Sequence, residues 1–144
     1  MRTFEEIKDT VETGLGKHPC DLKLANVQLV NVWSSEIYPT DIYIRHGRVV
    51  SIDPQAGLEA LETVDCGGQY AVPGLIDTHM HFETTMLSPE ALASVVVPAG
   101  STTLCADLME IANVAGAAGL KAMLTSMDRL PYRMLIEVSS RVPT

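Results

Sequence analysis

The sequence predicts an α/β protein, in which a small antiparallel β module precedes the first strands and helices of a parallel α/β architecture. Two patterns predict this. In the first half of the 144-residue chain, short runs of alternating apolar and polar residues are separated by turn residues, which indicates half-buried strands. In the second half, strand-like runs alternate with longer helix-like runs, which is typical of βαβ units. A hydrophobic fraction of 47% is enough for a buried core.

The chain begins with a predicted amphipathic helix over residues 3–15. Its apolar residues recur at steps of three and four, at Phe4, Ile7, Val11 and Leu15. Two glycines near the end of this segment can stop the helix. A linker that contains a proline then leads into the β module.

Three segments of the first half predict strands. Residues 21–32 alternate, with an irregularity near Asn26. Residues 41–52 predict a hairpin that turns at Gly47, because glycine supplies the positive φ that a tight turn needs. Residues 62–66 predict another short strand.

The second half predicts strands and helices in alternation. An apolar segment ends at His81, and Ser88 is the expected N-cap of the helix that follows. The later elements are a helix over 89–97, a buried strand over 101–107, a helix over 113–127 and a strand over 131–138. We therefore divide the chain into a helix and linker (1–19), a β segment (20–70) and a β/α segment (71–144).

Composition excludes several classes of partner. The chain has 10 Lys and Arg against 18 Asp and Glu, a net charge of −8, which argues against nucleic acids and anionic membranes as partners. Its three cysteines form no CxxC pair, so neither a disulfide framework nor a thiolate zinc site is expected. No apolar run is long enough for a membrane helix, and the first residues lack the apolar stretch of a signal peptide. We expect a cytoplasmic protein with reduced thiols.

The strongest chemical signal is the pair His79 and His81 at the end of an apolar segment. Residues two apart on a strand project to the same side, so the two imidazoles can present nitrogens to one divalent metal. Asp77 lies on that side too and can orient a histidine by accepting its second N–H. A bare HxH can be incidental, but the carboxyl end of a strand in a β/α architecture is where sites are built. We predict His79 and His81 as metal ligands.

Glu83 follows the histidine pair by two residues and lies on the same face if the strand continues. It is a candidate for accepting a hydrogen bond from a metal ligand or for contacting substrate. The alternative is a carboxylate in a solvated loop.

The sequence around these residues resembles a known enzyme signature. Val-Pro-Gly-Leu-Ile-Asp-Thr-His-Met-His, residues 72–81, is similar to the signature of the amidohydrolase superfamily. Residues 79–90, 98–103 and 110–114 resemble adenine deaminases, and the last of these, Glu-Ile-Ala-Asn-Val, narrows the resemblance to that branch.

The resemblance implies a metal-dependent hydrolase with a (β/α)8 barrel and a β-sandwich built from the segments that flank the barrel. It implies hydrolytic deamination of a purine base, adenine, to hypoxanthine and ammonia. The implied cofactor is a divalent metal, Mn, Fe or Zn, with a two-metal site in the complete enzyme. The resemblance also places Glu110 on the catalytic rim, so Glu83 and Glu110 are the candidate catalytic residues. It does not identify substrate-binding residues.

One position departs from the adenine-deaminase pattern. In that branch the Glu-Ile-Ala-Asn-Val stretch usually follows Asp-Pro-His, whereas here it follows Asp107, Leu108 and Met109. Methionine can neither ligate a hard metal nor carry a proton as histidine can. Another cyclic amide or a purine analogue therefore stays open as the substrate.

Length implies that the barrel is incomplete in this chain. A (β/α)8 barrel takes about 200–250 residues, and only 74 lie between Ala71 and Thr144. We expect an N-terminal fragment of a longer enzyme, inactive by itself. The alternative is a non-catalytic binding or structural subunit, either as a homo-oligomer or with a second chain that completes the barrel.

Overall fold

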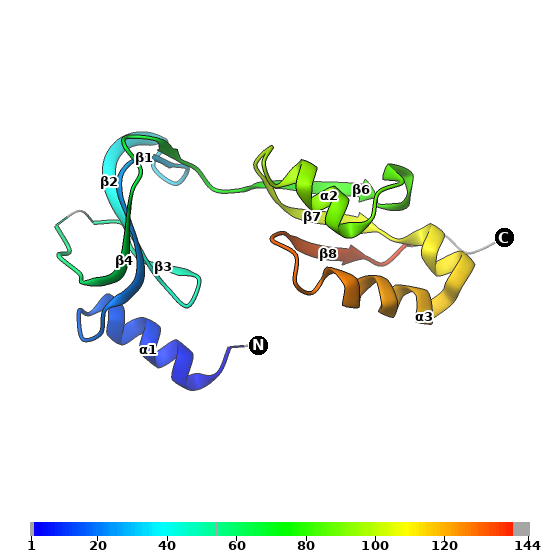
Figure 1. Ribbon diagram of the computed structural model, residues 1–144, viewed down its shortest axis with the longest axis horizontal. Helices are drawn as coiled ribbons and strands as arrows, with labels where there is room; N and C mark the ends of the chain where they lie inside the picture. The colour runs from blue at the N-terminus through cyan, green and yellow to red at the C-terminus, as the bar shows by residue number, and fades with distance from the viewer. Residues whose placement is uncertain (1, 54, 140–144) are drawn as a thin grey trace. The chain divides into compact units, whose positions relative to one another are not determined.

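The computed structural model describes residues 2–53 and 55–139. The chain divides into two compact units, Met1–Pro73 and Gly74–Thr144, which run from blue to green and from green to red in Figure 1. The division falls three residues after the boundary at residue 70 that the sequence suggested.

The first unit begins with helix α1 (Phe4–Gly14), as predicted. Thr3 and Glu6 form a capping box, in which each backbone N–H donates to the side chain of the other residue. Thr13 is fully buried, whereas the predicted apolar stripe is exposed, from 45% at Ile7 to 75% at Phe4. The helix therefore turns Thr13, and not its apolar stripe, toward the interior of this unit.

The sheet of the first unit is built around β1 (Cys20–Asn31). Its order is β3-β2-β1-β4, and β5 also pairs with β1. The other strands are β2 (Glu36–Arg45), β3 (Arg48–Ser51), β4 (Ala60–Asp65) and β5 (Tyr70–Ala71). Among the described residues this unit has one sheet, which can form one layer of the expected sandwich.

Our expectation of a wholly antiparallel module was wrong. The β1–β2 and β2–β3 pairs are antiparallel, but β4 and β5 both run parallel to β1. Alternation of apolar residues shows which face of a strand is buried and carries no information on the direction of its neighbour. The sheet is therefore mixed.

Two predicted irregularities are confirmed. The β1–β2 register shifts between Leu24 and Val27, where Asn26 has a φ of 57°. His46 and Gly47 join β2 to β3 with φ values of 49° and 66°, which is the backbone of a two-residue hairpin turn.

Ion pairs attach α1 to this sheet. Arg45 donates to Asp9 of α1 and to Asp21 of β1, both at 2.6 Å. His46 Nε2 lies 2.8 Å from the same Asp9 oxygen. The hydrogen bond from Arg45 lowers the pKa of Asp9, and the backbone N–H of His46 lowers the pKa of Asp21.

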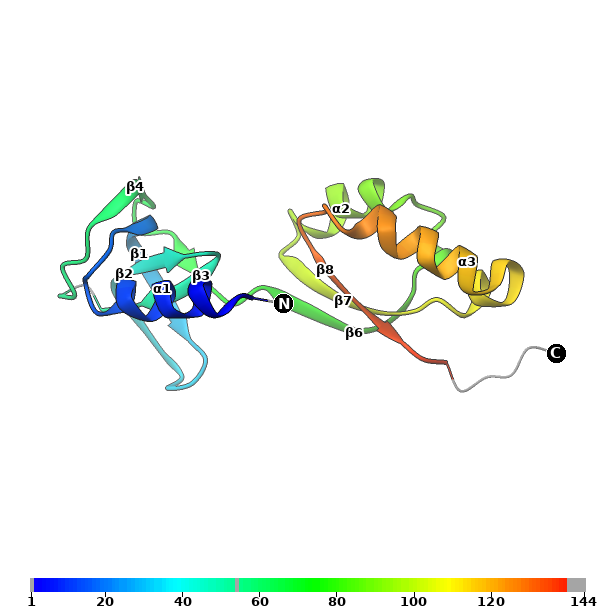
Figure 2. The same cartoon turned by 90° about the horizontal axis from the view of Figure 1, so that it is seen from below.

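The second unit is a parallel βαβαβ arrangement, as predicted. Its sheet has the order β6-β7-β8 with all pairs parallel. Figure 2 shows both helices on the same side of this sheet. The elements are β6 (Leu75–His81), the short 3-10 helix η1 (Glu83–Thr85), α2 (Pro89–Val96), β7 (Ser101–Asp107), α3 (Met109–Met127) and β8 (Arg133–Glu137). The sheet is open at three strands among the described residues, consistent with an incomplete barrel.

The helices of this unit differ in how closely they match the prediction. Ser88 caps α2 by accepting the Ala91 backbone N–H, as expected. Helix α3 begins at Met109 and not at 113. Leu108, the residue before it, makes no side-chain cap, so no capping residue in the sequence marks this start. Gly116, with φ 60° and ψ −156°, interrupts the helix and separates a short first segment from the longer second one. No helix in the described ranges is long and apolar enough to cross a membrane.

Candidate metal centre

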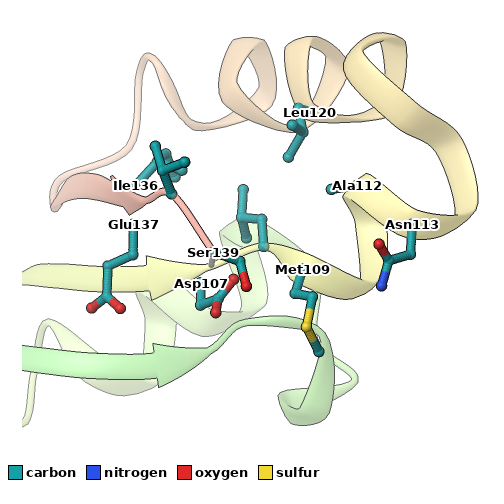
Figure 3. Close-up of a pocket in the computed structure, with 10 residues that line it drawn as sticks. Asp107, Met109, Ala112, Asn113, Leu120, Ile136, Glu137 and Ser139 are labelled. Carbon is teal, nitrogen blue, oxygen red and sulfur yellow. The ribbon is translucent and has the colours of Figure 1, made fainter. Parts of the chain in front are cut away.

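The three strands of the second unit end side by side in polar residues. The register pairs His81 of β6 with Asp107 of β7, and Asp107 with Glu137 of β8. Because the strands are parallel, these side chains lie at one carboxyl edge, the edge at which α/β proteins build sites. Figure 3 shows Asp107 and Glu137 at this edge.

The two faces of this sheet carry different kinds of side chain. One face belongs to the apolar core under α2 and α3, through Met80, Leu104, Ala106, Met134 and Ile136. Alternation along each strand turns the neighbouring side chains to the opposite face, which carries His79, His81, Cys105, Asp107 and Glu137 together with the exposed Leu135. The polar face therefore lies away from the helices.

His79 and His81 lie next to each other on the polar face. Their ring centroids are 5.4 Å apart and their planes meet at 86°. The His79 side chain is 58% exposed and that of His81 is 25% exposed. The spacing of this HxH therefore brings two imidazoles to one place.

His81 faces two carboxylates from separate segments. One ligand atom from each of His81, Glu83 and Glu110 lies within 4.8 Å of the others. Oε1 of Glu83 accepts the Ile111 backbone N–H at 3.0 Å, and Oε2 of Glu110 lies 3.5 Å from Nδ1 of His81. Strand β6 ends at His81, so Glu83 reaches the cluster from the η1 turn and not along a continued strand.

Three atoms of this cluster are buried and have no hydrogen-bond partner among the described residues. They are His81 Nδ1, Glu83 Oε2 and Glu110 Oε2. A buried polar group without a partner costs about 1–3 kcal/mol, and more if it is charged. A native protein tolerates such groups where a ligand or ion completes their bonding.

Glu110 has a charge state that suits a cation. Its pKa lies below the ordinary value, chiefly because its own backbone N–H bonds to the carboxylate and also because of the His81 imidazole. The ionised carboxylate is the form that binds a metal ion.

His79 has a partner that the sequence did not suggest. Its Nδ1 lies 2.8 Å from Oε2 of Glu137 at the end of β8. Asp77, which we expected to orient a histidine ring, instead accepts the backbone N–H of His79 at 3.1 Å. Glu137 is the only carboxylate in the predicted strand 131–138 and lies near its carboxyl end. That position is the feature of the sequence from which a role at the site could have been predicted.

A comparison with protein families matches residues 70–144 to the amidohydrolase family. The matched segment contains the histidine pair, the Glu83 turn and the Glu110 helix start. The chain belongs to the amidohydrolase family.

Curated relatives of this amidohydrolase chain are similar over nearly its whole length. An adenine deaminase of Desulforamulus reducens is 48% identical over 138 residues, which are 96% of this chain and 24% of that protein. An adenine deaminase of Kosmotoga olearia is 41% identical over 137 residues, 95% of this chain and 23% of that protein. The chain therefore spans about a quarter of the length of these relatives.

Solved structures support the amidohydrolase fold. An N-acyl-D-glutamate deacylase from Bordetella bronchiseptica, complexed with zinc and a phosphonate inhibitor, matches with a TM-score of 0.60. The identity is 16%, over 85% of this chain and 30% of that chain. A D-aminoacylase matches with a TM-score of 0.62 at 15% identity, over 84% of this chain and 30% of that chain.

The donor set of this amidohydrolase chain fits a divalent metal ion. One imidazole and two carboxylates supply the N and O donors that zinc and similar ions accept. Ligand atoms of the three residues lie within 4.8 Å of one another, so one ion between them would contact all three. His79 adjoins this set through its contact with the His81 ring.

A cavity of about 280 Å³ opens beside the strand ends of this amidohydrolase unit. Asp107, Met109, Asn113 and Glu137 are among its lining residues (Figure 3). Met109, which departs from the usual pattern, therefore borders the cavity next to the polar edge.

The remaining histidines have structural surroundings. His46 lies in the β2–β3 turn against Asp9, and His18 lies 3.5 Å from Glu12. Both are in the first unit.

Proposed function

We propose that this chain supplies the first quarter of a metal-dependent hydrolase that converts adenine and water to hypoxanthine and ammonia. The observation that carries the proposal is the set of unpartnered atoms on His81, Glu83 and Glu110. The names of the curated relatives, which match over nearly all of this chain, support adenine as the substrate.

We propose that His79 and His81 would hold the metal together with Glu83 and Glu110. When bound, a divalent ion makes water a nucleophile at neutral pH by lowering its pKa from 15.7 to about 7. We propose Mn, Fe or Zn, since imidazole and carboxylate accept all three. A second ion would require ligands from the parts of the relatives that lie outside this chain.

The residues of this chain prepare the site before substrate arrives. The Ile111 backbone N–H fixes one oxygen of Glu83, so the other oxygen is aimed at His81 and Glu110. The bond from its own backbone N–H keeps Glu110 ionised. In the reaction, an oxygen from water bonds to C6 of adenine, the C6–N bond breaks, and the amine leaves as ammonia with a proton from that water.

The proposed partner is a small purine base and not a nucleic acid or a membrane, in a cytoplasmic protein. The remaining barrel strands would come from polypeptide beyond these 144 residues, in the same chain, a second chain or another copy. Met109 at the cavity favours a second candidate, an amidohydrolase of another cyclic amide or purine analogue. A non-catalytic binding or structural subunit is the third hypothesis.

A chimera tests the proposal. The matching 138 residues of the Desulforamulus reducens relative are replaced by those of this chain, and ammonia release from adenine is measured with Mn²⁺, Fe²⁺ or Zn²⁺. We expect turnover by the chimera, loss of turnover in its His79→Ala and His81→Ala variants, and none from the 144-residue chain alone. Glu90→Gln, at an exposed position of α2, is the matched control.

The same assay separates the alternatives. Turnover of a purine analogue but not of adenine by the folded chimera would support the second candidate. A folded, metal-loaded chimera that hydrolyses no purine would support the non-catalytic subunit. Turnover by the 144-residue chain alone would contradict the expectation that the barrel must be completed.

A further inference from the structure

Glu137 is in contact with a proposed metal ligand and has no role in the proposal above. Its Oε2 lies 2.8 Å from Nδ1 of His79. The two residues are 58 positions apart in sequence, on β6 and β8, which are separated by β7 in the sheet. A contact across an intervening strand needs a specific local geometry.

The register of β6 provides that geometry. Asp77 pairs with Leu104 and Met80 pairs with Ala106, so Thr78 and His79 both stand opposite the single residue Cys105. This is a β-bulge, a device that re-aims a side chain beside an active site. Cys105 is small, and it lies on the same polar face as His79. The bulge and the small side chain together let the His79 ring reach over β7 to Glu137.

The contact determines which nitrogen of His79 carries the proton. An ionised carboxylate accepts hydrogen bonds and cannot donate them, so Nδ1 must be the donor. A neutral imidazole has one N–H and one bare nitrogen. With the proton on Nδ1, the lone pair is on Nε2.

We propose that Glu137 is a positioning residue, which holds His79 in the Nδ1–H tautomer and leaves Nε2 bare to bind a divalent cation. This rests on the proposed function, in which His79 is one of the metal ligands. A carboxylate that accepts the second N–H of a ligating histidine fixes its ring orientation and raises its basicity. Glu137 takes the role that the sequence suggested for Asp77, whose carboxylate is bound to the His79 backbone.

The location of Glu137 supports the assignment. It borders the 280 Å³ cavity at the strand ends (Figure 3), and its side chain is 36% exposed. It is paired in register with Asp107, which pairs with His81. His79 is thus anchored from the far strand of the sheet, while His81 faces Glu83 and Glu110.

The test compares Glu137→Gln and Glu137→Leu with Glu90→Gln, which removes a charge from an exposed site on α2. In the metal-free 144-residue chain at about pH 8.5, where imidazole is ordinarily neutral, long-range ¹H–¹⁵N spectra identify the protonated nitrogen of His79. We expect Nδ1–H in the unsubstituted chain and in Glu90→Gln. We expect a mixture of tautomers, weighted to Nε2–H, in Glu137→Leu.

The second readout is Zn²⁺ affinity by competition with a chelator. A carboxylate that accepts the second N–H of a metal-binding histidine contributes about 10–100-fold to metal affinity. We therefore expect Zn²⁺ affinity to fall by about that factor in Glu137→Leu and by less in Glu137→Gln, whose amide oxygen can still accept the hydrogen bond. Glu90→Gln leaves the affinity unchanged.

Nε2–H in the unsubstituted chain, or one tautomer in all variants, would overturn the proposal. So would equal Zn²⁺ affinity for the unsubstituted chain and Glu137→Leu. These outcomes are independent of adenine turnover, because the tautomer is measured without metal or substrate. A chimera that hydrolyses no purine would refute the proposed function and leave the tautomer assignment intact.

Discussion

The two units of this chain differ in how their buried and half-buried carboxylates are partnered. In Met1–Pro73, four aspartates are paired: Asp9 and Asp21 bind Arg45, Asp41 binds Lys23, and Asp65 binds Asn26. In Gly74–Thr144, Glu83, Asp107 and Glu110 each have a buried oxygen without a hydrogen-bond partner among the described residues, and that of Glu110 lies 3.5 Å from Nδ1 of His81.

This difference separates a structural use of charge from a functional one. Paired carboxylates fasten α1 and the irregular β1–β2 ladder in the first unit, where backbone N–H groups of Asn26 and His46 complete the bonding. Near His81, buried carboxylate oxygens without a hydrogen-bond partner make the second unit less stable by itself, and a bound cation would satisfy them. The net charge of −8 therefore does not describe one uniform acidic surface.

The largest expected effect comes from comparing the substitution of one histidine in each unit. In the chimera, we expect His81→Ala to lower kcat/KM for adenine by about 10³-fold or more, because a ligand of the metal is lost. His46→Asn is the matched control, since asparagine accepts the positive φ of that turn. Steady-state assays at saturating metal measure both. Equal losses in the two variants would contradict the division of roles.

Removal of the Arg45 side-chain charge should lower the thermal stability of the first unit. Arg45→Met leaves Asp9 and Asp21 without their charged donor, and we expect the thermal midpoint of this unit to fall by about 4–8 °C. Arg48→Met, at an exposed position of β3, should change it little. Amide hydrogen exchange of the β1 and β2 backbones follows this unit separately. The same midpoint in both variants would show that the ion pairs carry no stability.

Removal of a carboxylate should stabilise the second unit. Asp107→Asn removes the charge of a buried carboxylate that has an oxygen without a hydrogen-bond partner, and since burying a charge costs more than burying a neutral amide, we expect the free energy of unfolding to rise by about 1 kcal/mol. The matched change in the first unit, Asp41→Asn, breaks the pair with Lys23 and should have the opposite sign. Urea unfolding followed by amide exchange measures both signs. Two changes of the same sign would remove the contrast between the units.

Acid should weaken the first unit more steeply than the second. Four aspartates of the first unit have a lowered pKa because each accepts a hydrogen bond. Arg45 donates to Asp9 and the His46 backbone N–H donates to Asp21. Lys23 donates to Asp41 and Asn26 donates to Asp65. A carboxylate with a lowered folded-state pKa stabilises the fold above its unfolded pKa, ordinarily about 3.9, and this contribution is lost as pH falls through the folded value. In the second unit, the bond from its own backbone N–H lowers the pKa of Glu110. Unfolding free energies between about pH 5 and pH 2 should therefore slope more for the first unit, and equal slopes would contradict this.

Local signals in the sequence predicted much of this structure. The Asn26 irregularity and the turn at Gly47 depend on the backbone preference of one residue, and the Ser88 cap depends on one side-chain hydroxyl, all of which can be recognised in the sequence. The HxH spacing likewise predicted two adjacent imidazoles, because the period of a strand is two residues.

Features set by distant parts of the chain were not predicted. The parallel direction of β4 and the reach of His79 to Glu137 depend on which strands become neighbours. The early start of α3 at Met109 brings Glu110 to Glu83, but no capping residue marks it. The amphipathic stripe of α1 predicted a helix, yet ion pairs at Asp9 determine how that helix sits.

The central claim is that His81, Glu83 and Glu110, each with a buried atom that lacks a hydrogen-bond partner among the described residues, lie together in order to bind a cation. Calorimetric titration of the metal-free 144-residue chain with Zn²⁺, together with its Glu110→Gln variant, tests this most directly. We predict that the unsubstituted chain binds Zn²⁺ and that the affinity of the variant is lower by about 100-fold or more. Loss of a residue that only touches a metal ligand already lowers metal affinity by about 10–100-fold. The variant should also unfold at higher urea without metal. Equal Zn²⁺ affinity in the two proteins would contradict the claim.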